Sequence, residues 1–217
     1  MAGVEHLGLF VLAGWLLNLT PGPDVLFIVT NALRSGVRAG LIAALGITAG
    51  CFVHVFAAAL GVSALLATSA TAFTVLKWVG AIYLLYVGLQ LCLSKTPHAM
   101  NSIATCANNT GATSLKSIFF KGFWTNVLNP KVALFFLAFV PQFIAPDAAN
   151  KPLAFVLLGV LFSLNALPIN FGYAVLGGWA ARRLPLVQRG MHWLERVAGV
   201  MFIGFGLKLA LTDNPAP

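Results

Sequence analysis

Two residues of opposite charge each follow a proline inside strongly apolar stretches of the chain. Asp24 lies in NLTPGPDVLF (18–27), and Lys131 lies in NVLNPKVALF (126–135). A charge at the centre of a membrane-spanning helix costs about 2.5–3.5 kcal/mol on insertion scales, so each residue should have a partner and a purpose. Two interpretations stay open. The charges form a structural ion pair, or they bracket one zwitterion, with Asp24 facing its amino group and Lys131 its carboxylate.

The prolines beside these charges predict interrupted helices. Proline lacks a backbone donor and clashes with the carbonyl group four residues earlier, and hydrocarbon tolerates the resulting unpaired group only where it faces a cavity or another partner. We therefore expect Pro21-Gly22-Pro23 and Pro130 to break two helices that face the protein interior. The N–H end of a half-helix suits a carboxylate, and its carbonyl end suits an ammonium group. Two such breaks can form a site for a zwitterion.

Other polar residues within the apolar stretches extend this predicted site. Asn165 and Asn170 flank Pro168 and are candidates for the same cavity. Asp24 is also a candidate proton carrier, and so is His54, although a lone helical histidine more often hydrogen-bonds to a neighbour. We predict no catalytic residue, no cofactor and no metal site. The predicted substrate-binding residues are Pro21, Gly22, Pro23, Asp24, Asn126, Asn129, Pro130, Lys131, Asn165 and Asn170.

The composition places these residues in an integral membrane protein. Of the 217 residues, 59% are hydrophobic and only 8% are charged, whereas soluble domains carry about 25% charge. A helical span needs about 20 apolar residues. The net charge of +8 is spread thinly along the chain, so it indicates a positive-inside loop bias and not nucleic-acid binding. Six spans are predicted, at 7–31, 40–66, 71–94, 118–144, 152–180 and 193–212.

Basic residues mark alternate connections between these spans. The first, third and fifth connections are basic, whereas the second has only Lys77 and the fourth balances Asp147 against Lys151. The alternation predicts that both termini lie outside the cell membrane. The N-terminus carries Glu5 and no basic region, so it is not expected to be a cleaved signal peptide. The basic connections contain Arg34, Arg38, Lys95, Lys116, Lys121, Arg182, Arg183 and Arg189.

The two halves of the chain resemble each other. KWVGAIYLLYVGLQLCLS (77–94) aligns with RVAGVMFIGFGLKLALT (196–212), and the two proline segments align Asp24 with Lys131. Each half contains an odd number of spans, so the second half must be inserted upside down, as in many secondary transporters. We predict an all-α membrane protein of six helices in two inverted three-helix repeats with broken helices 1 and 4. The repeats are 1–94 and 118–217, joined by a cytoplasmic linker, 95–117.

Two longer segments carry a resemblance to a known family. TPGPDVLFIVTNALRSGVRAGLIAALGITAG (20–50) followed by FWTNVLNPKVALFFLAFVPQFI (123–144) resembles the lysine exporter (LysE) superfamily, in its homoserine/threonine (RhtB-type) branch. The resemblance spans nearly the whole chain. It implies an inner-membrane exporter of amino acids or close derivatives, driven by the proton gradient. Asp24 fits a position that varies in the family. The family's signature positions correspond to Pro21, Gly22, Pro23, Asn129, Pro130 and Lys131.

The resemblance implies an amino-acid substrate, for which we expect a neutral one such as homoserine, threonine or a leucine-like amino acid. The spans carry no second intramembrane acid, which disfavours a dibasic substrate such as lysine. Small-residue faces allow a homodimer. The sequence contains no GxxxxGK[ST] motif, which would indicate that ATP hydrolysis drives transport.

Three other classes of membrane protein fit less well. A thiol relay needs a cysteine beside the proline in helices 1 and 4, where Thr20 and Asn129 stand. A metal-ion or other small-ion exporter, kept as the alternative, needs several carboxylates or histidines in its spans, and the buried lysine repels cations. A passive channel has less use for opposite charges at its midplane than a protein with alternating access.

Overall fold

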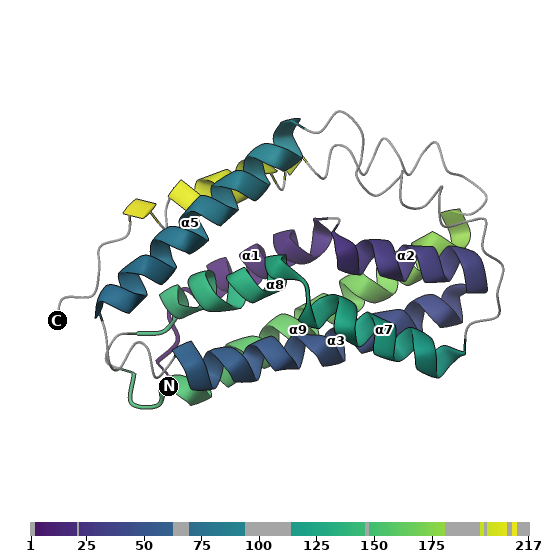
Figure 1. Ribbon diagram of the computed structural model, residues 1–217, viewed down its shortest axis with the longest axis horizontal. Coiled ribbons are helices and arrows are strands. Elements are labelled where there is room, and N and C mark those ends of the chain that lie inside the picture. The colour runs from purple at the N-terminus through teal and green to yellow at the C-terminus, as the bar shows by residue number, and fades with distance from the viewer. Residues whose placement is uncertain are drawn as a thin grey trace.

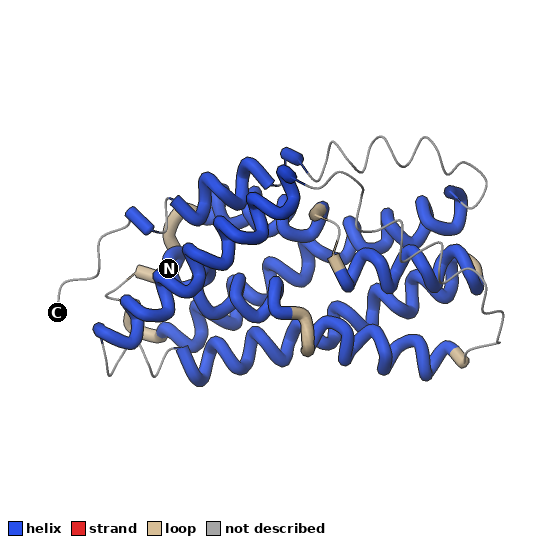
Figure 2. The backbone as a smooth tube through the Cα atoms, turned by 45° about the horizontal axis from the view of Figure 1, so that its top comes forward, coloured by secondary structure: helices blue, strands red, loops and turns tan. Residues whose placement is uncertain are grey.

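A computed structural model of the 217-residue chain describes residues 3–20, 22–62, 70–93, 114–145, 148–180, 196–197, 199–207 and 210–211. These residues are helical apart from turns and one isolated β-bridge between Val4 and Ile144 (Figure 2). The prediction of an all-α protein is confirmed for this part of the chain. Pro21, most of the linker and the smaller part of the sixth predicted span lie outside the described residues.

The first and fourth predicted spans are each bent, as expected from their prolines. The first consists of α1 (Leu7–Leu19) and α2 (Pro23–Ser35), which differ in direction by 51°. The fourth bends by 47° between its two halves. Both breaks lie near the middle of the long axis of the molecule (Figure 1). The parts of the fourth span are α7 (Leu115–Val127), α8 (Pro130–Leu134), the π-helical turn η2 (Phe135–Phe139) and the 3-10 turn η3 (Val140–Phe143).

Both second half-helices begin in the same way. In α2, the extended residue Gly22 precedes Pro23 in the first turn. In α8, the side chain of Asn129 accepts a hydrogen bond of 3.1 Å from the backbone N–H of Lys131, and Pro130 follows the cap. Proline is tolerated in a first turn because that N–H has no helical partner in any case. Each proline therefore starts a half-helix.

Four predicted spans are confirmed as membrane-spanning candidates by length and composition. Two are the bent pairs, and two are α3 (Val37–Ala57) with its π-helical end η1 (Ala58–Val62), and α9 (Lys151–Ala180). The third predicted span is occupied by α5 (Ala70–Leu93). The helical residues 199–207 run beside α5 (Figure 1).

Close packing between α3 and α7 depends on glycine. A Cβ atom on Gly46 would lie 2.2 Å from the carbonyl oxygen of Phe119, and one on Gly50 would lie 2.5 Å from that of Phe123. From the other side, a Cβ atom on Gly122 would lie 2.8 Å from the carbonyl oxygen of Ala43. The two backbones therefore approach too closely for any side chain at these positions.

Gly46→Ala is expected to destabilise the protein by about 1–3 kcal/mol, because overpacking forces the backbones of α3 and α7 apart. Gly172→Ala is the matched control, since a Cβ atom at that helical position meets nothing within 4 Å. Thermal unfolding in detergent measures both effects. Equal melting temperatures for the Gly46 variant and the native protein would contradict the observed packing.

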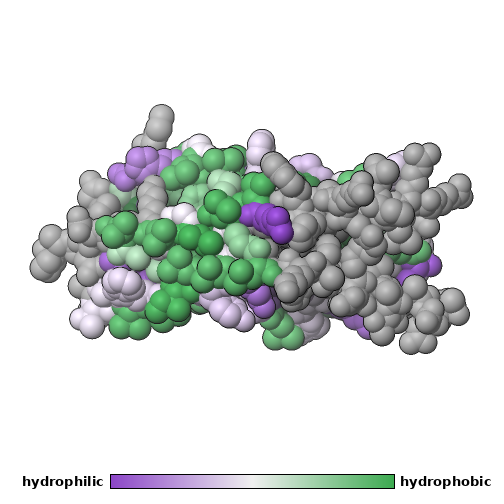
Figure 3. All heavy atoms as spheres, turned by 90° about the horizontal axis from the view of Figure 1, so that it is seen from above, coloured by the Kyte–Doolittle hydropathy of each residue, from purple (hydrophilic) through white to green (hydrophobic). Residues whose placement is uncertain are grey.

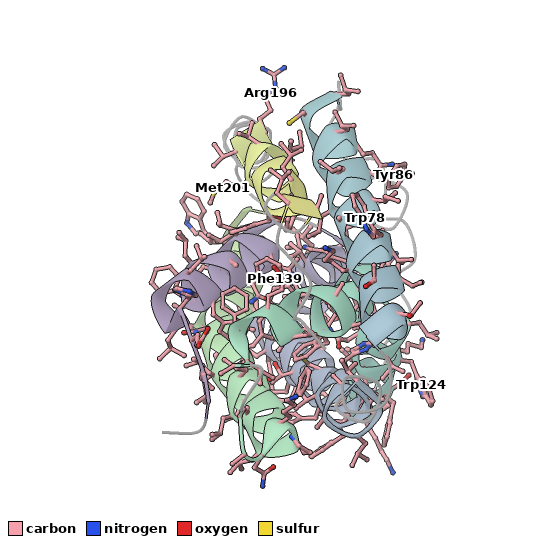
Figure 4. The ribbon with its side chains drawn as sticks, turned by 90° about the vertical axis from the view of Figure 1, so that its left-hand side faces the viewer. Trp78, Tyr86, Trp124, Phe139, Arg196 and Met201 are labelled. Atoms are coloured by element: carbon pink, nitrogen blue, oxygen red, sulfur yellow. The ribbon has the colours of Figure 1, made fainter. Side chains whose placement is uncertain are left out.

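An aromatic cluster fills the end of the molecule that contains η2 and η3. Phe135, Phe136, Phe139 and Phe143 are all buried, and the ring centroids of Phe139 and Phe205 are 5.1 Å apart. This aromatic run therefore serves packing. Figure 4 shows Phe139 in the interior, between the helices.

The outer face of α5 is strongly hydrophobic. Trp78 and Tyr86 point outward from this helix (Figure 4), and Figure 3 shows apolar side chains gathered on this side of the molecule. Such a face suits contact with lipid. The large exposed apolar residues of α5 are Val75, Trp78, Val79, Ile82, Tyr86, Leu89 and Leu93.

Lys77 corrects one detail of the sequence interpretation. It lies inside α5, 6% exposed, and not in the connection before it. Its Nζ atom is 5.7 Å from the centroid of the Trp78 ring. An alkyl stem that packs on apolar surface and a cation near an aromatic face allow a lysine this position.

Candidate functional site

A small cavity lies where the two helix breaks meet α3 and α9. Its volume is about 30 Å³, which is enough to hold a water molecule. The lining contains Leu17, Asn18, Thr20, Gly22, Asp24, Val25, Ile47, Thr48, Cys51, Asn126, Asn129, Lys131, Val132, Phe162, Ser163, Ala166 and Asn170.

The cavity brings together six of the residues predicted from the sequence. They are Gly22, Asp24, Asn126, Asn129, Lys131 and Asn170. Pro23 and Pro130 stand in the first turns of the half-helices beside it. Asn165 and His54 do not line it, and Pro21 lies outside the described residues.

Lys131 reaches from the first turn of α8 to the carbonyl end of α1. Its Nζ atom donates to the carbonyl oxygen of Leu17 at 2.6 Å and to that of Thr20 at 2.9 Å. The last carbonyl groups of a helix lack helical partners, and they form the negative end of its dipole. The ammonium group therefore satisfies two backbone oxygens at the first break.

Asp24 reaches across to the other break. Its Oδ2 atom accepts a hydrogen bond of 2.8 Å from Nδ2 of Asn126, near the end of α7. The carboxylate and the Lys131 ammonium, both in the described part of the chain, form no ion pair within 4.0 Å. A Cβ atom on Gly22 would lie 3.8 Å from Nζ of Lys131, so this glycine borders the ammonium directly. Each charge thus has its own partner on the opposite half of the molecule.

His54 forms a hydrogen bond with the carbonyl end of α7. Its Nε2 atom is 2.9 Å from the backbone oxygen of Asn126, and because a carbonyl can only accept, Nε2 carries the proton. The ring stacks against Phe136 with centroids 6.4 Å apart. The histidine is therefore bonded to a neighbour, as isolated helical histidines commonly are.

Three buried polar atoms at this cavity have no hydrogen-bond partner among the residues that the structure describes. They are Oδ1 of Asp24, Oδ1 of Asn126 and Oγ of Ser163. The hydroxyl of Thr48, by contrast, donates to the carbonyl four residues earlier in its own helix. Buried polar atoms without partners are costly, so such a group calls for water or a ligand. In the described part of the chain, no group of three or more His, Cys, Asp and Glu residues is placed to hold a metal ion.

Tyr173 is a residue of this site that the sequence reasoning missed. Its hydroxyl donates a hydrogen bond of 2.7 Å to the carbonyl oxygen of Leu19, at the end of α1. A usable signal existed, because Tyr173 lies three residues after Asn170 and therefore on a neighbouring part of the same helix face. Together with Lys131 it ties the end of α1 to α8 and α9.

Tyr173→Phe is expected to cost about 1–3 kcal/mol of stability, because it leaves the carbonyl of the half-buried Leu19 without its donor. Thermal unfolding in detergent measures this effect. Tyr86→Phe is the control, since that side chain is 59% exposed. Identical behaviour of the two variants would rule out a role for the Tyr173 bond.

Comparison with known proteins identifies the family. Residues 15–213 match the family described as LysE type translocator. The chain is 34% identical over 212 residues to an uncharacterized membrane protein of Pseudomonas aeruginosa, covering 96% of both chains. It is 32% identical over 203 residues to an uncharacterized membrane protein of Vibrio cholerae, covering 93% of this chain and 94% of the other.

A third relative has a named activity. The chain is 29% identical over 208 residues to the leucine efflux protein of Enterobacter sp. (strain 638), again covering 96% of both. No solved structure matches the chain. The match to the family extends over most of the sequence and includes both helix breaks and the cavity between them. The chain therefore belongs to the LysE type translocator family.

Proposed function

We propose that this protein exports a neutral amino acid, or a close derivative, from the cytoplasm by proton antiport. The observation that carries the proposal is the cavity between the two helix breaks, where one carboxylate and one ammonium group stand on opposite halves of the molecule. The family and the leucine efflux relative support a small amino acid as the substrate.

The unused hydrogen-bonding groups of Asp24 and Lys131 suit a zwitterion. Oδ1 of Asp24 is buried without a partner, and a carboxylate oxygen of this kind accepts strongly from an ammonium group. Lys131 uses two of its N–H groups on the end of α1, and an ammonium has three. The third can donate to the substrate carboxylate. The small cavity then represents a closed state that must open on one side to load.

We also propose that the two halves form an inverted repeat that rocks around this site. In support, Lys131 contacts the end of α1 while its aligned counterpart Asp24 contacts Asn126 near the end of α7. A carboxylate cannot bond to carbonyl oxygens, so an amide takes their place. Inverted repeats place substrate sites at such junctions.

Packing of α5 with the C-terminal helical residues supports the same symmetry. A Cβ atom on Gly88 would lie 2.7 Å from the carbonyl oxygen of Gly199, and one on Gly206 would lie 3.0 Å from that of Ala81. With one residue skipped at Val87, the sequence alignment pairs Gly88 with Gly206, and Gly199 with Gly80 beside Ala81. The two contacts are therefore near equivalents of each other.

The proposed orientation in the inner membrane places both termini outside. Arg34 and Lys116 lie at the end of the molecule where α2 ends and α7 begins, on the right in Figure 1. The N-terminal segment and the start of α9 lie at the opposite end (Figure 1). The positive-inside bias puts the basic end in the cytoplasm.

Efflux from proteoliposomes tests the proposal. The vesicles are loaded with the twenty protein amino acids plus homoserine, an inward proton gradient is imposed, and the released compounds are identified by mass spectrometry. Release of a few neutral amino acids that stops when the gradient is collapsed is the expected result. Release of none by folded protein, or release indifferent to the gradient, would overturn the proposed export or its proton coupling.

The variants His54→Gln and Asp24→Asn distinguish the two candidate proton carriers. If Asp24 carries it, His54→Gln, which keeps a donor for the Asn126 carbonyl, retains gradient-dependent export. Loss of gradient dependence in the His54 variant alone would transfer the coupling role to His54.

A further inference from the structure

The place that Lys131 occupies is itself a site for a cation. Its Nζ atom lies 2.6 Å and 2.9 Å from the carbonyl oxygens of Leu17 and Thr20, where α1 ends. Carbonyl ends of interrupted helices are the positions at which transporters hold Na⁺ or protons. Here the positive group at this position is the side-chain ammonium of Lys131.

The carbonyl oxygens at this position cannot rely on solvent. Leu17 is 3% exposed and Thr20 is 2% exposed. The Thr20 hydroxyl does not help, because it donates to the carbonyl of Leu16 at 2.6 Å. Oxygens that are buried in this way need a donor or a cation. Without the Lys131 ammonium group, these oxygens would attract a cation from solution.

The charge of the site selects a monovalent ion. Among the described residues that line the cavity, Asp24 supplies the single carboxylate and Lys131 the single cation. One positive charge balances that carboxylate, whereas calcium sites gather several carboxylates and carbonyl oxygens around each ion. Gly22 borders this position, because a Cβ atom there would lie 3.8 Å from Nζ.

We propose that the carbonyl end of α1 is a monovalent-cation site that the Lys131 ammonium fills permanently. The protein consequently needs no sodium for transport, and removing the side chain opens the site to a free monovalent cation. The sodium independence rests on the proposed function, whereas the cation site itself does not.

Lys131→Ala with added cations tests the inference. Alanine retains Cβ, so n-propylammonium supplies the missing atoms of the lysine side chain. Purified protein is melted in choline chloride, sodium chloride and n-propylammonium chloride. Sodium or n-propylammonium should raise the melting temperature of the variant by about 3 °C or more and leave the native protein unchanged. Lys121→Ala, which removes an exposed lysine from α7, is the control and should behave as the native protein.

Export by the same proteins gives the second readout. The native protein should export equally in sodium and in choline, and the Lys131 variant should be inactive in choline and recover by about tenfold or more with one of the two cations. A folded Lys131 variant that responds to neither cation in melting or export would overturn the inference, as would a sodium requirement of the native protein. A melting response without export by the native protein would refute the proposed function and leave the cation site standing.

Lys131→Arg covers the case in which the alanine variant cannot be obtained folded in any of the three salts. Arginine retains the cation, so this variant should fold and melt at the same temperature in choline and in sodium. Failure of the arginine variant to fold, or its stabilisation by sodium, would overturn the inference.

Discussion

Lys131→Gln is expected to lower amino-acid export by about 100-fold or more, because losing one partner of a buried charged contact costs about 2–5 kcal/mol and about 1.4 kcal/mol corresponds to a factor of ten. Glutamine fills similar space and can still donate to one of the carbonyl groups of Leu17 and Thr20 that Nζ holds now. It cannot neutralise Asp24 or the negative end of α1. Stability should therefore fall by about 3–5 kcal/mol, the usual cost of leaving a buried charge without its counterpart.

Initial efflux rates from proteoliposomes and melting temperatures in detergent measure the two effects of Lys131→Gln. Lys121→Gln is the control, because Lys121 is exposed on α7. Export within twofold or so of the native rate from a folded Lys131→Gln protein would mean that this residue does not contact the substrate.

Asp24→Asn is expected to reduce export by a similar factor, about 100-fold, with a smaller loss of stability. Asparagine has nearly the same shape, and its carbonyl oxygen can accept the hydrogen bond that Asn126 now donates at 2.8 Å. What disappears is the negative charge and the unpartnered Oδ1 acceptor that faces the cavity. The measurement is efflux as a function of the imposed proton gradient. Residual transport should no longer respond to the gradient if Asp24 carries the proton.

The double variant of Asp24→Asn and Lys131→Gln separates a structural pair from a substrate site. Removing both charges leaves neither one uncompensated, so part of the lost stability should return. Export should stay as low as in the single variants, because neither end of the zwitterion is then held. Recovery of export together with stability would show that the two charges serve only the fold.

The positions of the helix breaks follow from the sequence because their causes are local. A proline limits its own φ and removes one N–H wherever it stands, so Pro23 and Pro130 had to begin half-helices or disrupt whole ones. Span length is local as well, since it depends on a run of apolar side chains. The same reasoning singled out Asp24 and Lys131, because a charge in such a run is expensive whatever surrounds it.

Helix-face geometry explains why the predictions for Asn165 and Asn170 had different outcomes. Asn165 and Asn170 are five residues apart, and five residues of an α-helix turn through more than one full circle, so the two side chains leave α9 in different directions. Only Asn170 lines the cavity. The interpretation from proximity to Pro168 did not take this rotation into account.

Partners across the interior were decided by the tertiary structure alone. The sequence offered Asp24 as the natural partner of Lys131, but the ammonium bonds to the end of α1 and the carboxylate bonds to Asn126. Backbone carbonyl groups are the same in every residue, so no sequence pattern marks which helix end a lysine will meet. The Tyr173 bond to Leu19 escaped prediction for the same reason. The sequence by itself determined where the helices break and which residues carry charge, whereas the packing of α1, α8 and α9 determined which atoms those residues hold.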